Sequence, residues 1–481
     1  MSTQHPDNVT IPFFASNPTL NGDDEVQEAF YVYSHLGIEE QLWDVEGKEV
    51  DNYVVTKLLS KYPDYFKQNK LGEQKFLTLR APNPDVEKNE AKVLPELIFS
   101  IPRNHDIATV FYQQDTTPIF EIVIPMCNSE KPLIRIHEFY KHFITESSHK
   151  KIGDVTVESW LGNFKPKSIR VTPLFETKEE ILNSASHVEK YIQYAKINDF
   201  QRVWYARSDP ALNYGSVAAI LMVKVALQRL HVLEKKYGLE LLPIIGLGSA
   251  PFRGNFRPST VQKILGGYPS VQTFTIQSAF KYDYPLKQVI EAVDYINKTE
   301  RKEPYPVDEQ IALHYIDMIE NDYVDTIKEI APLITDFSKY LPGRRKRKMH
   351  TGLFGYSRNA SGIKLPRAIS FCAVLYSLGI PPEIFGLSKL TKEDLSKIKA
   401  FYSNIKFDLE EALQYLNEDN LVILPEKIQE KMLKTIKLFN YKTNLEHREA
   451  TAKILKAYKE NNHAVVSEWV IHAGKIRGFL G

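Results

Sequence analysis

Three consecutive stretches decide the fold of this chain: RVWYARSD (202–209), SVAAILMVKVALQRLHVLEKKYG (216–238) and LLPIIGLGS (241–249). The first and third are short apolar runs, typical of strands that are buried on both faces of a parallel sheet. The second is a longer, largely apolar stretch that predicts a helix. It ends at a glycine, the residue preferred just after a helix. Strand, helix and strand in this order predict a parallel βαβ unit.

The same pattern recurs along most of the chain, with amphipathic helical stretches between the apolar runs. One of these stretches opens with TKEE at Thr177, as a capping box does. This repetition predicts an α/β fold, best described as a (β/α)₈ TIM-like barrel with additional α-helices. The other strand candidates are FLTLR (76–80), PIFEIVIPM (118–126), SIRVTPLFE (168–176), SVQTFTIQS (270–278) and KMHTGLFGYS (348–357).

The end of the sequence has a different character. From about Lys389 the sequence is typical of charged amphipathic helices and has no strand-like runs. A chain of 481 residues is long enough for one large domain or two modest ones. Because no long flexible linker interrupts it, we expect a single compact domain over 1–481, with a barrel at about 70–385 and a helical C-terminal region at about 386–481.

Composition excludes several classes of function. The 61 lysines and arginines balance 60 aspartates and glutamates, so no global field attracts nucleic acid or an anionic membrane. No basic n-region opens the sequence, and we expect no apolar run near the roughly 20 residues of a membrane span. Two separated cysteines fit a reducing setting. We therefore expect a cytoplasmic protein with no nucleic-acid or membrane partner.

Polar residues end nearly every predicted strand. Glu176 ends one, Arg207 and Asp209 end the next, and Gln277 ends another. In a barrel these ends share one face, where such enzymes place their chemistry. Carboxylates suit a hard cation such as Mg²⁺ or Mn²⁺, and arginines suit phosphate and carboxylate. The sequence therefore predicts a metal site for an anionic, phosphorylated substrate.

Simpler interpretations compete with this one. A single carboxylate at a strand end is more often a helix cap or half of an ion pair. GSAPFRGN (248–255) can be only a glycine-rich turn, and it matches no nucleotide-binding motif. His5 alone is most simply part of a disordered tail. RRKRK (344–348) has the composition of a nucleic-acid patch but is more often a solvated face or a local anion site.

Eight separated blocks add a family resemblance, to phosphoenolpyruvate carboxylase and in particular to its short, archaeal-type branch. The blocks cover nearly the whole chain in order. They are STQHPDN (2–8), WDVEGKEVD (43–51), LTLRAPNP (77–84), ARSDPALNYG (206–215), GSAPFRGN (248–255), TIQSAFKYDY (275–284), GLFGYSRNASG (352–362) and PRAISF (366–371).

The resemblance implies two metal ligands. The metal-binding PLFET block of the longer bacterial and plant enzymes is similar to residues 173–177, which places a ligand at Glu176. Their GYSDSAKDAG block resembles RSDPALNYG, which places the second ligand at Asp209. The implied cofactor is Mg²⁺ or Mn²⁺.

The resemblance also implies catalytic and substrate-binding residues. The TAHPTE histidine of the longer enzymes is similar to His5, which reverses the tail interpretation. Their FHGRGG loop resembles PFRGN and places an arginine of the carboxyl-transfer site at Arg253, beside Gly254. Pro251 stands where that loop has a histidine, so no role carries over for it. The further implied substrate contacts are Arg80, Arg207, Gln277, Ser357, Arg358 and Arg367, with phosphate binding by the last two arginines.

The implied reaction joins bicarbonate to phosphoenolpyruvate, giving oxaloacetate and inorganic phosphate through carboxyphosphate and a pyruvate enolate, and so supplies C4 acids. His5 is the implied base, and a mobile loop around Arg253 is expected to close over the site. A homotetramer and inhibition by aspartate or malate are further implications, although KIRGFLG (475–481) departs from the longer enzymes' ending. Two alternatives stay open: another metal-dependent barrel lyase, such as an aldolase or phosphoenolpyruvate mutase, and a nucleic-acid-binding protein using RRKRK, with steeply salt-dependent binding.

Overall fold

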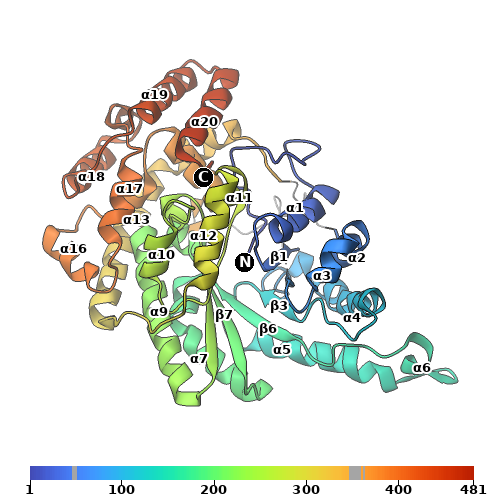
Figure 1. Ribbon diagram of the computed structural model, residues 1–481. Helices are drawn as coiled ribbons and strands as arrows, with labels where there is room; N and C mark the ends of the chain where they lie inside the picture. The colour runs from blue at the N-terminus through green and yellow to red at the C-terminus, as the bar shows by residue number, and fades with distance from the viewer. Residues whose placement is uncertain (46–50, 346–358, 361–362) are drawn as a thin grey trace.

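Seven parallel strands form the central sheet of the computed structural model, which describes residues 1–45, 51–345, 359–360 and 363–481 (Figure 1). Their spatial order follows their order in the chain, and each neighbouring pair is parallel. The strands are β1 (Glu40–Asp44), β2 (Phe76–Arg80), β3 (Glu121–Ile124), β6 (Arg170–Phe175), β7 (Phe200–Ala206), β8 (Glu240–Gly246) and β9 (Thr273–Phe274). Two short antiparallel hairpins pair β4 (Lys151–Ile152) with β5 (Val155–Thr156), and β10 (Asn359–Ala360) with β11 (Ile363–Lys364).

The sheet is curled and has apolar cores on both faces. A large core lies between the sheet and the helices. A separate small cluster joins Leu42, Val123, Leu174, Trp204 and Ile244, contributed by five different strands, so these side chains meet on the concave face. Burial on both sides explains the continuous apolar text of the strands, and it confirms the predicted α/β class with a parallel sheet.

The predicted eight-stranded barrel is not confirmed. The candidate eighth strand, 348–357, lies outside the described residues. Both edge strands are instead bonded to the start of the chain: Ser2 N donates to Glu40 O of β1 at 2.7 Å, and Thr3 N donates to Ile276 O beyond β9 at 2.9 Å. The same segment bridges β1 and the residues after β9, so the first residues of the chain lie between the two edges of the sheet.

β1 is a strand that sequence reasoning missed. Its text, EQLWD, lacks the apolar run of the others, because the buried positions Gln41 and Asp44 are polar. Gln41 donates to Leu42 O at 2.8 Å, and Asp44 N donates to the Gln4 side chain at 2.8 Å. The sheet therefore includes residues before position 70, where the predicted barrel region begins.

Helices pack around the sheet and agree with the predicted pattern. Thr177 caps α7 with a capping box to Glu180, as TKEE predicts, and Gly238 follows α9 with φ +61°. The helices before the C-terminal region are α1 (Asp23–Ser34), α2 (Val54–Lys61), α3 (Pro63–Gln68), α4 (Val93–Tyr112), α5 (Lys131–Tyr140), α6 (Val157–Leu161), α7 (Lys178–Ala195), α8 (Ser208–Tyr214), α9 (Ser216–Tyr237), α10 (Val261–Gly267), α11 (Ser278–Tyr282), α12 (Leu286–Lys298), α13 (Glu309–Phe337) and α15 (Ala368–Ser377).

Helix α9 corrects one expectation. By length and composition this helix could cross a membrane, whereas we expected no apolar run near the length of a membrane span. In the structure 78% of its apolar window is buried, which is the environment of a core helix. Its apolar residues face the sheet and the neighbouring helices α7 and α13.

The C-terminal region is helical, as predicted. After residue 386 it contains helices and turns but no strand, in a part of the chain that is described without a gap. Figure 1 shows these helices gathered at one side of the molecule, away from the arm that carries α6. They are α16 (Lys392–Lys399), α17 (Ile405–Leu413), α18 (Glu426–Ile436), α19 (Leu445–Lys459) and α20 (His463–Arg477).

The first two residues of the RRKRK run are structural, which corrects the predicted solvated face. Arg344 donates to the backbone oxygens of Asn8 and Val9. Arg345, 6% exposed, bonds Glu25 at 2.8 Å and Glu28 at 2.7 Å. Buried and paired, these two arginines are not available to nucleic acid. Residues 346–348 lie outside the described residues.

The ion cluster around Glu28 gives a first prediction, on stability. Burial raises the pKa of Glu28, but Arg345 and Lys281 outweigh it and hold the pKa near 2, against an ordinary 4.5. A depressed pKa stabilises the folded state fully above about pH 4.5, and the stabilisation is lost as the pH falls toward 2. Because Glu28→Gln removes the carboxylate paired with buried Lys281 and leaves Arg345 with Glu25 as its acidic partner, we expect it to lower the free energy of unfolding by about 3–5 kcal/mol at pH 7.

Urea denaturation from pH 7 down to pH 4 measures this effect. The difference between wild type and Glu28→Gln should begin to shrink below about pH 4.5, whereas Glu291→Gln, at a carboxylate whose side chain is 65% exposed, should change little at any pH. A Glu28 effect no larger than that of Glu291 would contradict the assignment.

Candidate active site

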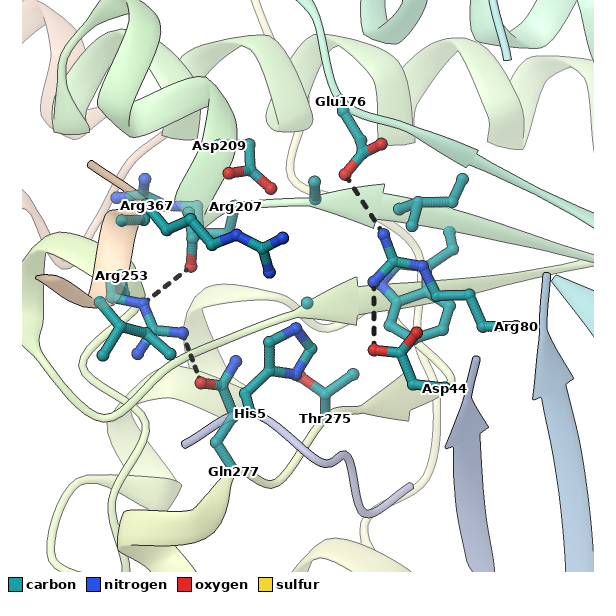
Figure 2. Close-up of a pocket in the computed structure, with 17 residues that line it drawn as sticks. His5, Asp44, Arg80, Glu176, Arg207, Asp209, Arg253, Thr275, Gln277 and Arg367 are labelled. Atoms are coloured by element: carbon teal, nitrogen blue, oxygen red, sulfur yellow. Dashed lines mark hydrogen bonds and ion pairs between the residues drawn. The ribbon is translucent and has the colours of Figure 1, made fainter. Parts of the chain in front are cut away.

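One polar pocket lies at the ends of the central strands, as the sequence predicts (Figure 2). Asp44 is the last residue of β1 and Arg80 the last of β2, while Glu176 directly follows β6 and Arg207 directly follows β7. Parallel strands bring these positions to the same edge of the sheet. The polar residues that line the pocket are His5, Asp44, Arg80, Glu176, Arg207, Ser208, Asp209, Arg253, Thr275, Gln277 and Arg367.

Two carboxylates, Glu176 and Asp209, face this pocket from neighbouring strand ends. The cap of α7 is Thr177 rather than Glu176, and no side-chain cap bond forms at the start of α8, which holds Asp209 in its first turn. The helix-cap interpretation therefore fails for both residues. In Figure 2 both carboxylates lie on the same side of the pocket, across from His5.

Local backbone structure fixes Glu176. Glu180 accepts hydrogen bonds from the backbone N–H of Glu176, at 2.9 Å, and of Thr177, at 3.1 Å, which fixes the turn after β6. One Glu176 oxygen accepts the Met126 N–H at 3.1 Å, and the other lies 3.8 Å from Arg80 Nη2. The side chain, 8% exposed, is thereby held toward the pocket.

These carboxylates could hold a divalent cation. No group of three or more histidine, cysteine, aspartate or glutamate side chains in the described chain is arranged as a closed metal cage. Mg²⁺ commonly needs no such cage, because it binds through one or two carboxylates and completes its shell with water and substrate oxygens. Glu176 and Asp209 fit that donor set.

Three arginines surround the carboxylates. Arg80 lies between Asp44 and Glu176, with Nη1 3.5 Å from Asp44 Oδ2. Arg207, 1% exposed, donates from Nη2 to Ser216 Oγ at 2.9 Å, but its Nε and Nη1 find no hydrogen-bond acceptor among the described residues. Arg367, half-buried just before α15, also lines the pocket. Buried guanidinium donors without acceptors favour an anionic ligand.

Arg253 lies in the GSAPFRGN turn, where it is buried and hydrogen-bonded on several sides. It is 1% exposed, and it donates to Ser208 Oγ at 3.2 Å, to Gly481 O at 2.8 Å and to Gln277 Oε1. It also lies 3.4 Å from Asp7 Oδ2. The predicted loop that closes over the site is therefore already packed in this structure.

The glycines of this turn explain how Arg253 can be buried. Gly254 has φ +132°, and a Cβ there would lie 2.6 Å from the Leu247 side chain. A Cβ on Gly248 would lie 2.7 Å from the Arg253 guanidinium carbon. Gly254 does not itself line the pocket, so its effect is on the path of the backbone.

His5 belongs to an ordered segment, so the disordered-tail interpretation is wrong. Its carbonyl accepts the Ser278 N–H at 3.2 Å, and its Nδ1 lies 2.9 Å from Thr3 Oγ1. The Thr3 hydroxyl itself donates to Ile276 O at 3.3 Å. A Thr3 hydroxyl that donates to Ile276 O can accept from His5 Nδ1–H, an arrangement that leaves the acceptor lone pair of the neutral ring on Nε2.

The structure does not place three predicted residues in the pocket, Gly254, Ser357 and Arg358, and it adds another residue. Ser357 and Arg358 lie outside the described residues, whereas His5, Arg80, Glu176, Arg207, Asp209, Arg253, Gln277 and Arg367 all line the one pocket. The addition is Asp44, fully buried beside Arg80. Its signal was the WDVEGKEVD block, in which it is the first carboxylate.

The chain is similar over its whole length to known proteins of one family. A family model described as phosphoenolpyruvate carboxylase matches residues 1–481. A phosphoenolpyruvate carboxylase of Methanospirillum hungatei is 48% identical, over 100% of this chain and 99% of the relative; one of Pyrococcus furiosus is 46% identical with the same coverage. Among solved structures, a Haloferax volcanii malate synthase is similar over 86% of this chain and 96% of that chain, with a TM-score of 0.40 and 10% identity, too distant to bear on chemistry.

Proposed function

The chain belongs to the phosphoenolpyruvate carboxylase family, and from this premise we propose how its pocket carries out the family reaction. The protein is a carboxy-lyase that carboxylates phosphoenolpyruvate to oxaloacetate, with release of phosphate. The observation that best supports the residue roles below is the meeting of Glu176, Asp209, His5 and the arginines in one pocket.

Phosphoenolpyruvate carries phosphate and carboxylate groups, and we propose that the arginines hold it. Arg207 and Arg367 line the pocket, and Arg80 lies beside Glu176. Ser357 and Arg358 join them on the strength of the family resemblance alone. Without these cations, a trianionic substrate and bicarbonate would repel each other.

Glu176 and Asp209 are the proposed ligands of Mg²⁺ or Mn²⁺. When bound, the cation would supply positive charge beside the substrate phosphate and the enolate oxygen that forms. Arg80, which lies between Asp44 and Glu176, would add positive charge beside the substrate. Glu176, Asp209 and Arg80 would together fix the position of the substrate relative to His5.

The proposed reaction has two stages. A bicarbonate oxygen attacks phosphorus and the bond from phosphorus to the enol oxygen breaks, giving carboxyphosphate and the pyruvate enolate. His5 Nε2 then takes the carboxyl proton of carboxyphosphate. The bond between the carboxyl carbon and the phosphate oxygen of carboxyphosphate breaks, and CO₂ and phosphate form. The enolate carbon attacks CO₂ to give oxaloacetate, and the proton passes from His5 to phosphate. Arg253 and Gln277, bonded to each other, are proposed to retain the CO₂-forming group during this stage.

A coupled assay tests the proposed function. Purified protein should oxidise NADH through malate dehydrogenase when phosphoenolpyruvate, bicarbonate and Mg²⁺ are all present. Omitting bicarbonate or adding a chelator should abolish the signal. An unchanged signal without bicarbonate would exclude carboxylation as its source.

Thr3→Val gives a second prediction, because valine has the shape of threonine but cannot accept the His5 Nδ1 proton. The ring is then free to carry its proton on Nε2, where it cannot act as a base. We expect oxaloacetate formation to fall by about 10-fold to 100-fold, with pyruvate formed instead. Thr3→Ser keeps the hydroxyl and should keep most oxaloacetate formation. Equal ratios of oxaloacetate to pyruvate in the two variants would contradict this tautomer assignment.

The family resemblance supports two finer proposals, a homotetramer and inhibition by aspartate or malate. Arg253 donates to Gly481 O, so the last residue of the segment 475–481 contacts an arginine of the pocket. Light scattering tests the first proposal. Titrating malate into an assay that follows phosphate release tests the second. An unchanged rate at saturating malate would contradict it.

A further inference from the structure

Asp7 joins the start of the chain to turns of the active site that come from the middle of the sequence. It is fully buried and belongs to the N-terminal strap, which we define as residues 1–10. Its Oδ1 accepts the Ala279 N–H at 2.7 Å. Its Oδ2 accepts the Ser249 N–H at 3.3 Å and lies 3.4 Å from Arg253 Nη1. One carboxylate thus contacts the turns after β8 and β9 and the buried arginine.

Arg253 has an acidic side-chain partner in Asp7. Its other side-chain partners, the Ser208 hydroxyl and the Gln277 amide oxygen, are neutral, and it also donates to Gly481 O. In the described part of the chain, Asp7 is the acidic side chain within ion-pair distance of Arg253. A buried guanidinium without a counter-charge carries a large desolvation penalty, so removing Asp7 should displace Arg253 or draw in another anion.

The strap also carries His5, and the two residues share neighbours. The His5 carbonyl accepts the N–H of Ser278, and Asp7 accepts the N–H of Ala279, the next residue. The Asp7 N–H in turn donates to the His5 carbonyl at 3.1 Å. Any shift of Asp7 relative to this pair of N–H groups would therefore move both the histidine and the arginine.

We infer that Asp7 is a positioning residue for carboxyl transfer, holding His5 and Arg253 in register while carboxyphosphate breaks down. This inference rests on the proposed function. It predicts a specific defect: phosphoryl transfer, which does not use Asp7, continues, while capture of CO₂ by the enolate fails. A residue that served only to anchor the strap would reduce both stages together.

Asp7→Asn is the most direct variant, because it keeps the shape of the side chain. One oxygen can still accept the Ala279 N–H, but the new NH₂ group then faces the Ser249 N–H and the Arg253 guanidinium, which are donors. We expect the rate of oxaloacetate formation to fall about 100-fold, the loss associated with about 1 Å of misplacement. Phosphate release should fall far less, so pyruvate becomes the main product.

Asp283→Asn is the matched control. Asp283 holds the same strap by accepting the N–H groups of Val9, at 2.8 Å, and Thr10, at 2.6 Å, and no ion pair joins it to Arg253. If anchoring the strap were all that mattered, both variants would change the product ratio alike. We expect Asp283→Asn to keep the wild-type ratio of oxaloacetate to pyruvate, even where it lowers thermal stability.

The experiment measures oxaloacetate, pyruvate and phosphate in parallel for the wild type, Asp7→Asn, Asp283→Asn, His5→Asn, Arg253→Gln and the Asp7→Asn/Arg253→Gln double variant. We expect the double variant to partition like Arg253→Gln alone, because both changes remove one interaction. If Asp7→Asn does not fold, Asp7→Ser removes the carboxylate without adding a donor and takes its place.

The outcomes separate this inference from the function on which it rests. A wild-type ratio in Asp7→Asn, or an equal change in Asp283→Asn, overturns the positioning role while a disturbed ratio in His5→Asn leaves the proposed function standing. An undisturbed ratio in His5→Asn overturns the proposed mechanism itself. Loss of oxaloacetate with continued phosphate release in Asp7→Asn alone, among the two aspartate variants, supports the inference.

Discussion

Asp209→Asn is expected to lower oxaloacetate formation by about 1000-fold or more with little change in fold. The substitution keeps the size of the side chain and removes one of the two carboxylates proposed to bind the metal. A neutral amide is a poor ligand for a hard divalent cation, and several kcal/mol of transition-state stabilisation depend on that charge. Steady-state kinetics over a range of Mg²⁺ concentrations measures the loss.

The control for this prediction is Asp317→Asn, which neutralises an aspartate on α13 whose side chain is 66% exposed. It should leave the rate near that of the wild type. Asp209→Asn should also weaken Mn²⁺ binding, which electron paramagnetic resonance measures without any turnover. Wild-type Mn²⁺ affinity in Asp209→Asn would contradict the assignment of the ligand, whatever its rate.

His5→Asn is expected to uncouple the two stages of the reaction. Asparagine can stay in the strap, but it cannot take a proton at neutral pH, so oxaloacetate formation should fall by about 100-fold to 10,000-fold. Phosphate release should persist, since the groups proposed to bind the phosphate are Arg207, Arg367 and the metal ligands. The enolate would then be protonated to pyruvate.

Two coupled assays on the same sample measure this uncoupling. Malate dehydrogenase, present throughout, traps oxaloacetate before it can decarboxylate, and lactate dehydrogenase added afterwards measures pyruvate. His314→Asn, at an exposed histidine of α13, is the control and should not alter the ratio. An unchanged yield of oxaloacetate in His5→Asn would remove the histidine from the mechanism.

The sequence predicted the parts of the fold that repeat locally. Apolar runs located six of the seven strands, because burial on both faces of a parallel sheet imposes a continuous apolar text. β1 escaped this reasoning, since Gln41 and Asp44 are buried but polar, and the Asp44 side chain lies beside Arg80 of another strand. Similarly, the capping box at Thr177 was visible in four letters, because a cap depends only on neighbours in the chain.

The site was predictable where strand ends carry it and not where the chain folds back on itself. Glu176 and Asp209 follow from strand topology, and their family blocks agree. Asp7 and Arg253, 246 positions apart, make a contact that no local pattern could reveal. Arg345 shows the opposite error: its charged context predicted a solvated face, whereas Glu25 and Glu28 bury it.

The most direct test is the position of the metal. Crystals grown with Mn²⁺ and diffracted at the manganese absorption edge should show an anomalous peak within direct coordination distance of Glu176 and Asp209, in the pocket that also holds Arg207, Arg253 and Arg367. A peak elsewhere in the molecule, with these two carboxylates uncoordinated, would contradict the account at its centre.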